Sequence, residues 1–109
     1  MVNIRVLPPT QEDIRYCIEY ARDEFGRKCV LRWKKELEAI YARLIMFPLS
    51  YSPEPILKDF HRDYRRALLM DNFKLIYRYD KERDEIVIVD IWYTKRSQQA
   101  LLRQFKRKL

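Results

Sequence analysis

The chain has 109 residues, of which 48% are apolar and 36% are charged. This length fits a single domain, residues 1–109, with one hydrophobic core, and the apolar content excludes an intrinsically disordered chain. The net charge of +7 at neutral pH favours an acidic partner, either nucleic acid or an acidic protein. The alternative is a protein that is basic for no functional reason, but the charge is segregated. The last fifteen residues contain no acidic residue. They contain six cations: Lys95, Arg96, Arg103, Lys106, Arg107 and Lys108.

Several classes of protein are not expected from the sequence. No apolar run approaches the roughly 20 residues of a membrane span, and no signal peptide is visible, so we expect a cytoplasmic protein without membrane contact. Cys17 and Cys29 are too few for a disulfide framework or a zinc site, and we expect them to be buried free thiols. Since there is no Gly-rich phosphate loop, nucleophile elbow or metal-ligand cluster, we expect no metal and no cofactor.

The chain begins with a predicted strand and a predicted helix. Residues 2–6 alternate between apolar and polar positions, which is typical of a short strand, and Pro8-Pro9 ends it. Thr10 is the predicted N-cap of the helix, and Gly26, the only glycine, is predicted to end it in a left-handed conformation. The apolar residues of this helix form one stripe: Ile14, Cys17, Ile18, Ala21 and Phe25.

A second, longer helix follows and ends at Pro48. Its predicted apolar stripe contains Val30, Trp33, Leu37, Ile40, Leu44 and Phe47. Glu36 and Glu38 are assigned to its solvent face. Because almost no loop separates the two helices, we expect an antiparallel helical hairpin packed against a sheet. A partner-binding coiled coil is the alternative, but the stripes are short and favour packing within the molecule.

The second half of the chain is predicted to form the sheet. Residues 49–63 contain prolines and are expected to form an ordered loop. Three strands follow, at 64–69, 73–79 and 86–93, with a tight turn at Asp71-Asn72 and a charged turn at 80–85. The last strand is apolar on both faces and is therefore predicted to be central.

A final helix is predicted after Ser97, its expected cap. Leu101, Leu102 and Phe105 are assigned to its inner face, and Arg103, Lys106, Arg107 and Lys108 to its outer face. The predicted fold class is therefore α+β: an N-terminal strand, an antiparallel helical hairpin packed on an antiparallel β-meander, and a short C-terminal helix.

This order of elements resembles the RelE/ParE superfamily of type II toxin–antitoxin toxins over nearly the whole chain. The resemblance rests on these motifs: Phe25-Gly26, Phe47-Pro48, Tyr64-Arg65, Phe73-x-Leu75-Ile76-Tyr77 and the run 88–96. It implies a growth-inhibiting toxin of a plasmid-stabilisation module, neutralised by a cognate antitoxin with an acidic tail. RelE-like members cleave mRNA on the ribosome, whereas ParE-like members inhibit DNA gyrase by binding it.

The RelE-like catalytic pattern is only partly present. Arg65 stands where such a site has the first of two lysines in the strand at 64–69. Lys74 stands where the next strand has an arginine, and Arg96 matches the arginine after the last strand. Ala67 and Leu102 stand where the pattern requires a second lysine and a tyrosine. The cations that bind phosphate are therefore retained, while two groups that transfer protons or stack on a base are missing.

Two residues could replace the missing groups. His61 has a suitable pKa range for acid–base work, although a lone loop histidine is usually a surface residue, and Tyr93 lies beside Arg96 at the end of the last strand. Trp92 should point to the opposite face and belong to the core. The residues expected to contact the target or phosphate are Arg65, Arg66, Lys74, Lys95 and Arg96.

Three functions follow from the resemblance. We expect a ParE-like toxin that binds DNA gyrase. The first alternative is a RelE-like endonuclease acting on the ribosome and mRNA, with Arg65, Lys74, Tyr93, Arg96 and His61 as catalytic residues. The second alternative is a non-toxic remnant of the fold.

Overall fold

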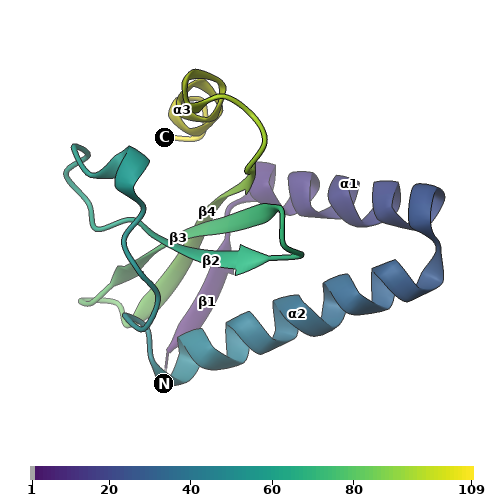
Figure 1. Cartoon of the computed structure of the whole chain (residues 1–109). Coiled ribbons are helices and arrows are strands. Elements are labelled where there is room, and N and C mark those ends of the chain that lie inside the picture. Colours follow the sequence, from purple (N-terminus) through teal and green to yellow (C-terminus); the bar gives the residue numbers. More distant parts are fainter. Residues whose placement is uncertain (1) are drawn as a thin grey trace.

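The computed structural model describes residues 2–109, which form one sheet and its covering helices (Figure 1). In chain order the elements are β1 (Asn3–Val6), α1 (Pro8–Phe25), α2 (Arg27–Met46), the 3-10 helix η1 (Pro55–Leu57), β2 (Arg65–Leu69), β3 (Phe73–Asp80), β4 (Glu85–Tyr93) and α3 (Gln98–Lys106). The α+β fold class is confirmed, and the predicted elements occur in the predicted order.

The sheet has the strand order β1-β4-β3-β2. Strands β2, β3 and β4 form the antiparallel meander, and β1 adds to the far edge of β4 in parallel, which makes the sheet mixed. β4 is central, as its apolar sequence predicts. Its register against β3 shifts between Ile76 and Tyr77, which pair with Asp90 and Ile88 and leave Val89 as the extra residue of a bulge.

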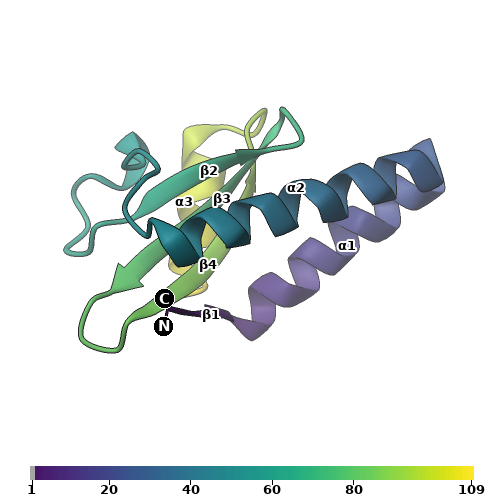
Figure 2. The same cartoon turned by 90° about the horizontal axis from the view of Figure 1, so that it is seen from below.

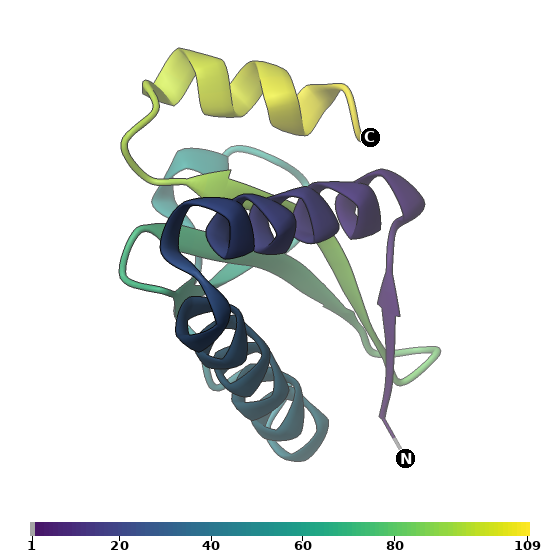
Figure 3. The same cartoon turned by 90° about the vertical axis from the view of Figure 1, so that its right-hand side faces the viewer.

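The two faces of the sheet are covered by different elements (Figures 2 and 3). Helices α1 and α2 cover one face, where Leu75, Tyr77 and Ile88 pack with Trp33 and Leu44. Helix α3 and the segment around η1 cover the other face. Its core contains Ile76, Val87, Trp92, Leu101 and Phe105. Trp92 is fully buried, as predicted.

The two predicted stripes of the helical hairpin are too long by one residue each. Phe25 and Phe47 are 70% and 60% exposed. The tip of the hairpin projects beyond the sheet, so Phe25 has no strand to pack against (Figures 1 and 2). Phe47 follows the last residue of α2 in a non-helical conformation, with φ −137° and ψ 78°, and leaves the helical face. Gly26 alone joins the two helices. Its φ is 86°, so the predicted positive φ is confirmed.

The prediction that Thr10 caps α1 is wrong. The helix begins three residues earlier, at Pro8 with Leu7 as its N-cap, because proline is favoured in the first turn, where an N–H has no helical partner. Thr10 is instead fully buried, and its hydroxyl donates a 2.8 Å hydrogen bond to the carbonyl oxygen of Val89. It therefore satisfies the backbone at the bulge of β4.

The predicted turn between β2 and β3 is displaced by one residue. Met70 and Asp71 have positive φ, rather than Asp71 and Asn72. The Glu36 carboxylate, predicted to lie on the solvent face, is half-buried and accepts a 2.9 Å hydrogen bond from the Met70 amide, so it fastens this turn to α2. Ser97 caps α3 as predicted, accepting a hydrogen bond from the Ala100 amide.

Both cysteines are free, as predicted, but they are half-buried rather than buried. None of the helices among residues 2–109 is long and apolar enough to cross a membrane.

Candidate functional site

A cleft of about 410 Å³ opens between α1, the ends of β3 and β4, and α3. We call it the α1–α3 cleft. Its wall carries three aromatic side chains, Tyr16, Phe73 and Tyr93, and the cations Arg96, Arg107 and Lys108. Phe73 and Tyr93 are cross-strand partners with ring centroids 5.4 Å apart. Aromatic faces beside cations suit a ligand that is partly planar and partly anionic.

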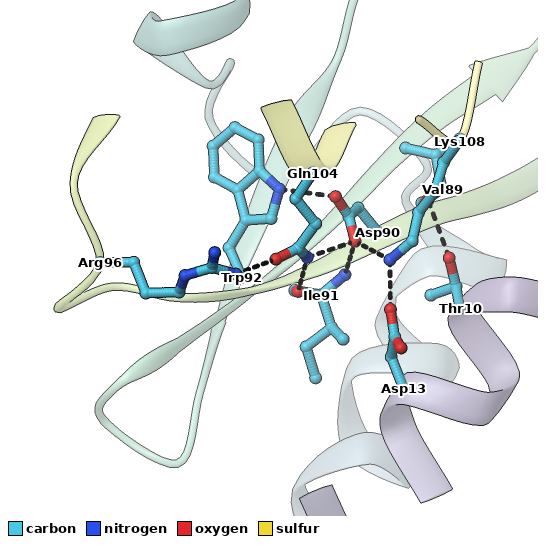
Figure 4. Close-up of polar contacts among 9 residues, drawn as sticks. All are labelled: Thr10, Asp13, Val89, Asp90, Ile91, Trp92, Arg96, Gln104 and Lys108. Atoms are coloured by element: carbon cyan, nitrogen blue, oxygen red, sulfur yellow. Dashed lines mark hydrogen bonds and ion pairs between the residues drawn. The ribbon is translucent and has the colours of Figure 1, made fainter. Parts of the chain in front are cut away.

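A buried carboxylate, Asp90, lies behind Gln104 and Lys108, two residues that line the cleft (Figure 4). It accepts hydrogen bonds from the Ile91 amide at 2.9 Å, the Trp92 indole at 2.8 Å and the Gln104 amide group at 2.9 Å. The Lys108 ammonium donates to the same carboxylate. A charge that is removed from water needs this density of partners, and Asp90 has it.

The outward position predicted for Lys108 is wrong. Its side chain is only 10% exposed, and its ammonium bridges Asp90 on β4 and Asp13 on α1. Because Lys108 follows the end of α3, this bridge ties the C-terminal segment to both the sheet and the helical hairpin. Gln104 adds a second tie, since its amide nitrogen also donates to the Ile91 carbonyl at 2.9 Å.

Arg96 is held over the cleft by Gln104, whose side-chain oxygen accepts a hydrogen bond from the Arg96 guanidinium (Figure 4). The arginine itself is exposed. Tyr93 lines the same cleft and is 40% exposed. The structure therefore brings together the two predicted site residues that lie at the end of β4.

Cys17 lies in the wall of the cleft. Burial, followed by the nearby Asp13 carboxylate, raises the pKa of its thiol to about 11, although Lys108 opposes the shift. The thiol therefore stays protonated at neutral pH, and it lacks the thiolate form that a cysteine nucleophile needs.

Arg65 lies away from this cleft, near the end of α2. Its guanidinium donates to the Asp63 carboxylate at 3.0 Å and to the carbonyl oxygens of Leu49 and Tyr51 at 3.2 and 2.7 Å. These contacts hold the loop after α2 against the first residue of β2. The charge of Arg65 is thus used within the protein.

Arg66 and Lys74 point to the α3 side of the sheet, where both meet the buried Glu54. The Lys74 ammonium lies 2.8 Å from a Glu54 oxygen, and the Arg66 guanidinium lies 3.7 Å from the same oxygen. The other Glu54 oxygen accepts from the Ile56 amide at 3.0 Å and caps η1. Glu54 is only 1% exposed, so it neutralises these two cations from within the loop.

The remaining predicted positions are dispersed. Ala67 is fully buried beneath the helices, Leu102 is half-buried, and His61 is exposed in the loop before β2. Lys95 is exposed in the turn between β4 and α3. The residues of the alternative catalytic set therefore do not meet in one place: Tyr93 and Arg96 line the α1–α3 cleft, and Arg65, Lys74 and His61 do not.

Sequence reasoning missed the polar residues that organise the site, above all Asp90, Glu54 and Gln104. Asp90 had a visible signal, because it is the only charged residue within the apolar run 86–93. A carboxylate in a central strand is buried and needs a partner. Glu54 stands between two prolines in a loop and gave no comparable signal. Among residues 2–109, no cluster of His, Cys, Asp and Glu has the geometry of a metal site.

A sequence model for a family described as the ParE toxin of the type II toxin–antitoxin system parDE matches residues 4–98. The chain belongs to the ParE toxin family. As a ParE toxin it is the toxin component of a type II toxin–antitoxin module and has a cognate antitoxin as partner. None of the curated protein sequences matches it.

Two solved structures have a similar fold. One, described as the chromosomal ParDE toxin–antitoxin system from P. aeruginosa, has a TM-score of 0.66 at 14% identity and covers 87% of this chain and 98% of its own. The other, the isolated E. coli RelE toxin, has a TM-score of 0.59 at 14% identity and covers 98% of each chain. At this identity the two likenesses establish the fold.

Proposed function

We propose that this ParE toxin inhibits DNA gyrase by binding it, within a plasmid-stabilisation module whose antitoxin neutralises it in the cytoplasm. One observation carries the proposal: the cations at the nuclease-like strand positions are already bound by groups of the same molecule. Arg65 is held by Asp63 and two carbonyl oxygens, and Lys74 is held by Glu54. Bound in this way, they support the sheet and its loop rather than a reacting phosphate.

Proton transfer supplies the second argument. Attack by an RNA 2′-hydroxyl requires a general base and a general acid within hydrogen-bond reach. Ala67 and Leu102 carry no ionisable group where a RelE-like site has them. The Arg65 guanidinium stays charged at any ordinary pH and is a poor base, and the raised pKa of Cys17 keeps its thiol protonated. These features favour an activity that depends on binding.

The proposed contact surface is the rim of the α1–α3 cleft. Among the cations predicted to contact the target, Lys95 and Arg96 are exposed. The side chains of Arg65, Arg66 and Lys74 are 19%, 31% and 20% exposed and have internal partners. Lys95 and Arg96 therefore carry most of the proposed interaction, and Arg65, Arg66 and Lys74, which do not line the cleft, contribute less.

A gyrase supercoiling assay with purified protein tests this proposal. The wild-type protein should inhibit supercoiling, and the Lys95→Ala/Arg96→Ala variant should need about tenfold more protein for half-inhibition or worse. Arg27→Ala removes an exposed cation at the start of α2 and serves as the matched control, with unchanged inhibition expected. Wild-type protein that leaves supercoiling intact and cleaves mRNA on programmed ribosomes would refute the proposal.

One observation favours the RelE-like mRNA endonuclease as the second candidate. Tyr93 and Arg96 line the same cleft, so a phenol and a guanidinium are available beside one another for a leaving group and a phosphate. In that case Arg96→Ala should abolish both mRNA cleavage and growth arrest. Growth arrest that persists in this variant would exclude the arginine from catalysis.

A further inference from the structure

A second hollow, of about 560 Å³, lies at the opposite end of strands β3 and β4. Five cations line it: Arg5, Arg62, Arg78, Lys81 and Arg83. Among the described residues, two carboxylates, those of Asp80 and Glu82, also line it, and Asp80 forms an ion pair with Arg83 at 3.9 Å. We call this hollow the arginine groove. None of the residues assigned above to target contact or catalysis belongs to it.

Three segments that are distant in sequence bring the arginines together. Arg5 on β1 and Arg78 on β3 are both cross-strand partners of Val87 on β4, so the two side chains flank the same residue. Partners in register point to the same face of a sheet. Val87 packs with Trp92 on the face that α3 covers. Arg62 reaches the groove from the loop before β2.

The charges of the groove are incompletely neutralised. Arg5 forms an ion pair with Glu85 at 3.1 Å, but within residues 2–109 neither Arg62 nor Arg78 has a carboxylate within ion-pair distance. Partial burial, followed by repulsion from Arg62, lowers the pKa of Arg78, and Arg5 adds to the repulsion. In contrast, Arg65 on β2 and Lys74 on β3 both have carboxylate partners. The free protein therefore carries a repulsion here that a bound anion would relieve.

We propose that the arginine groove binds a phosphate group, carried either by a nucleotide or by a nucleic acid. One guanidinium satisfies a carboxylate in this molecule, as Arg5 does for Glu85. Several guanidinium groups in one hollow match an anion that has more charge and more acceptor oxygens than a carboxylate. A phosphate group has both. An acidic peptide would also need apolar pockets for its side chains. The lining of the groove offers only the ring of Tyr79.

Calorimetric titration of the full chain with pyrophosphate, at constant ionic strength, tests the proposal. Wild-type protein should bind pyrophosphate saturably, and Arg78→Gln should weaken binding about tenfold or more. Arg27→Gln, which removes the same charge from the start of α2, should bind like wild type. At equal concentration, pyrophosphate should raise the Tm of the wild-type protein and of Arg27→Gln by the same amount, and that of Arg78→Gln by less.

The outcomes are distinct from those of the gyrase assay, because they concern a different surface. Absence of saturable binding by the wild-type protein, or equal binding by Arg78→Gln and Arg27→Gln, would overturn the site. Oligonucleotides of one sequence with and without a 5′-phosphate separate the two sources: equal binding indicates the backbone, and preference for the phosphorylated strand indicates a terminal phosphate. A glutamate-rich peptide that binds the groove more tightly than either strand would overturn the assignment to phosphate.

Discussion

Replacing Lys108 with methionine tests the buried bridge that fastens the C-terminal segment. The substitution keeps an unbranched side chain, one heavy atom shorter, and removes the ammonium that meets Asp90 and Asp13. Asp90 is fully buried, so its carboxylate would keep three neutral hydrogen-bond donors and lose its counter-ion. Breaking a buried ion pair from one side costs about 3–5 kcal/mol. We expect the lower end, about 3 kcal/mol, because the neutral donors remain.

For a domain of this size that loss lowers Tm by roughly 12 °C. Urea unfolding followed by tryptophan fluorescence measures it directly, since the Trp92 indole donates to Asp90. Lys106→Met, on the exposed side of α3, is the control and should change stability by less than about 0.5 kcal/mol.

A double-mutant cycle separates the bridge from the packing of the two side chains. In Lys108→Met/Asp90→Asn neither partner carries a charge, so the combined loss should fall short of the sum of the single losses by about 1–3 kcal/mol. Additive losses, or a loss below about 1 kcal/mol for Lys108→Met alone, would refute the reasoning that the bridge stabilises the attachment of α3.

Three further predictions follow from single positions. Gly26→Ala should cost about 1–3 kcal/mol in a thermal unfolding measurement, because its φ of 86° and ψ of −172° strain any residue with a Cβ, although nothing lies within 4 Å; a neutral effect would show that the junction rearranges. Glu54→Gln should cost about 2–3 kcal/mol in urea unfolding, since Lys74 would lose its buried partner, and a change below about 0.5 kcal/mol would contradict this role. In Cys29→Ala protein, alkylation of Cys17 by iodoacetamide should accelerate about tenfold per pH unit until its pKa of about 11, because the folded state disfavours the thiolate; a plateau below pH 9 would contradict the shift.

The fold was predictable from the sequence because hydrophobic periodicity governs most of it. The central position of β4 follows from its continuous apolar run, and the helical hairpin follows from two stripes separated by Gly26. The errors lie where tertiary contacts outweigh local preference. Thr10 serves the bulge carbonyl of Val89 instead of a helix end, and a bulge has no signature in a strand of Ile and Val.

The site was less predictable because it depends on pairs that are remote in the sequence. Lys108 looks like one of several solvent-facing cations until the structure places it beside Asp90 and Asp13. Arg65 and Lys74 look like free cations of a hairpin until a loop supplies their partners. Local pattern gives the charge of a residue, but only the tertiary fold decides whether that charge is available to a ligand.

Controlled induction of the protein in cells, followed over time for DNA breaks and for mRNA cleavage, distinguishes gyrase inhibition from nuclease activity. We expect gyrase-dependent DNA breaks to accumulate, to be suppressed by co-expression of the antitoxin, and to precede any change in mRNA integrity. Mapped cleavage within translated mRNAs, with intact DNA and unaltered supercoiling, would contradict the account and assign this ParE toxin a nuclease function.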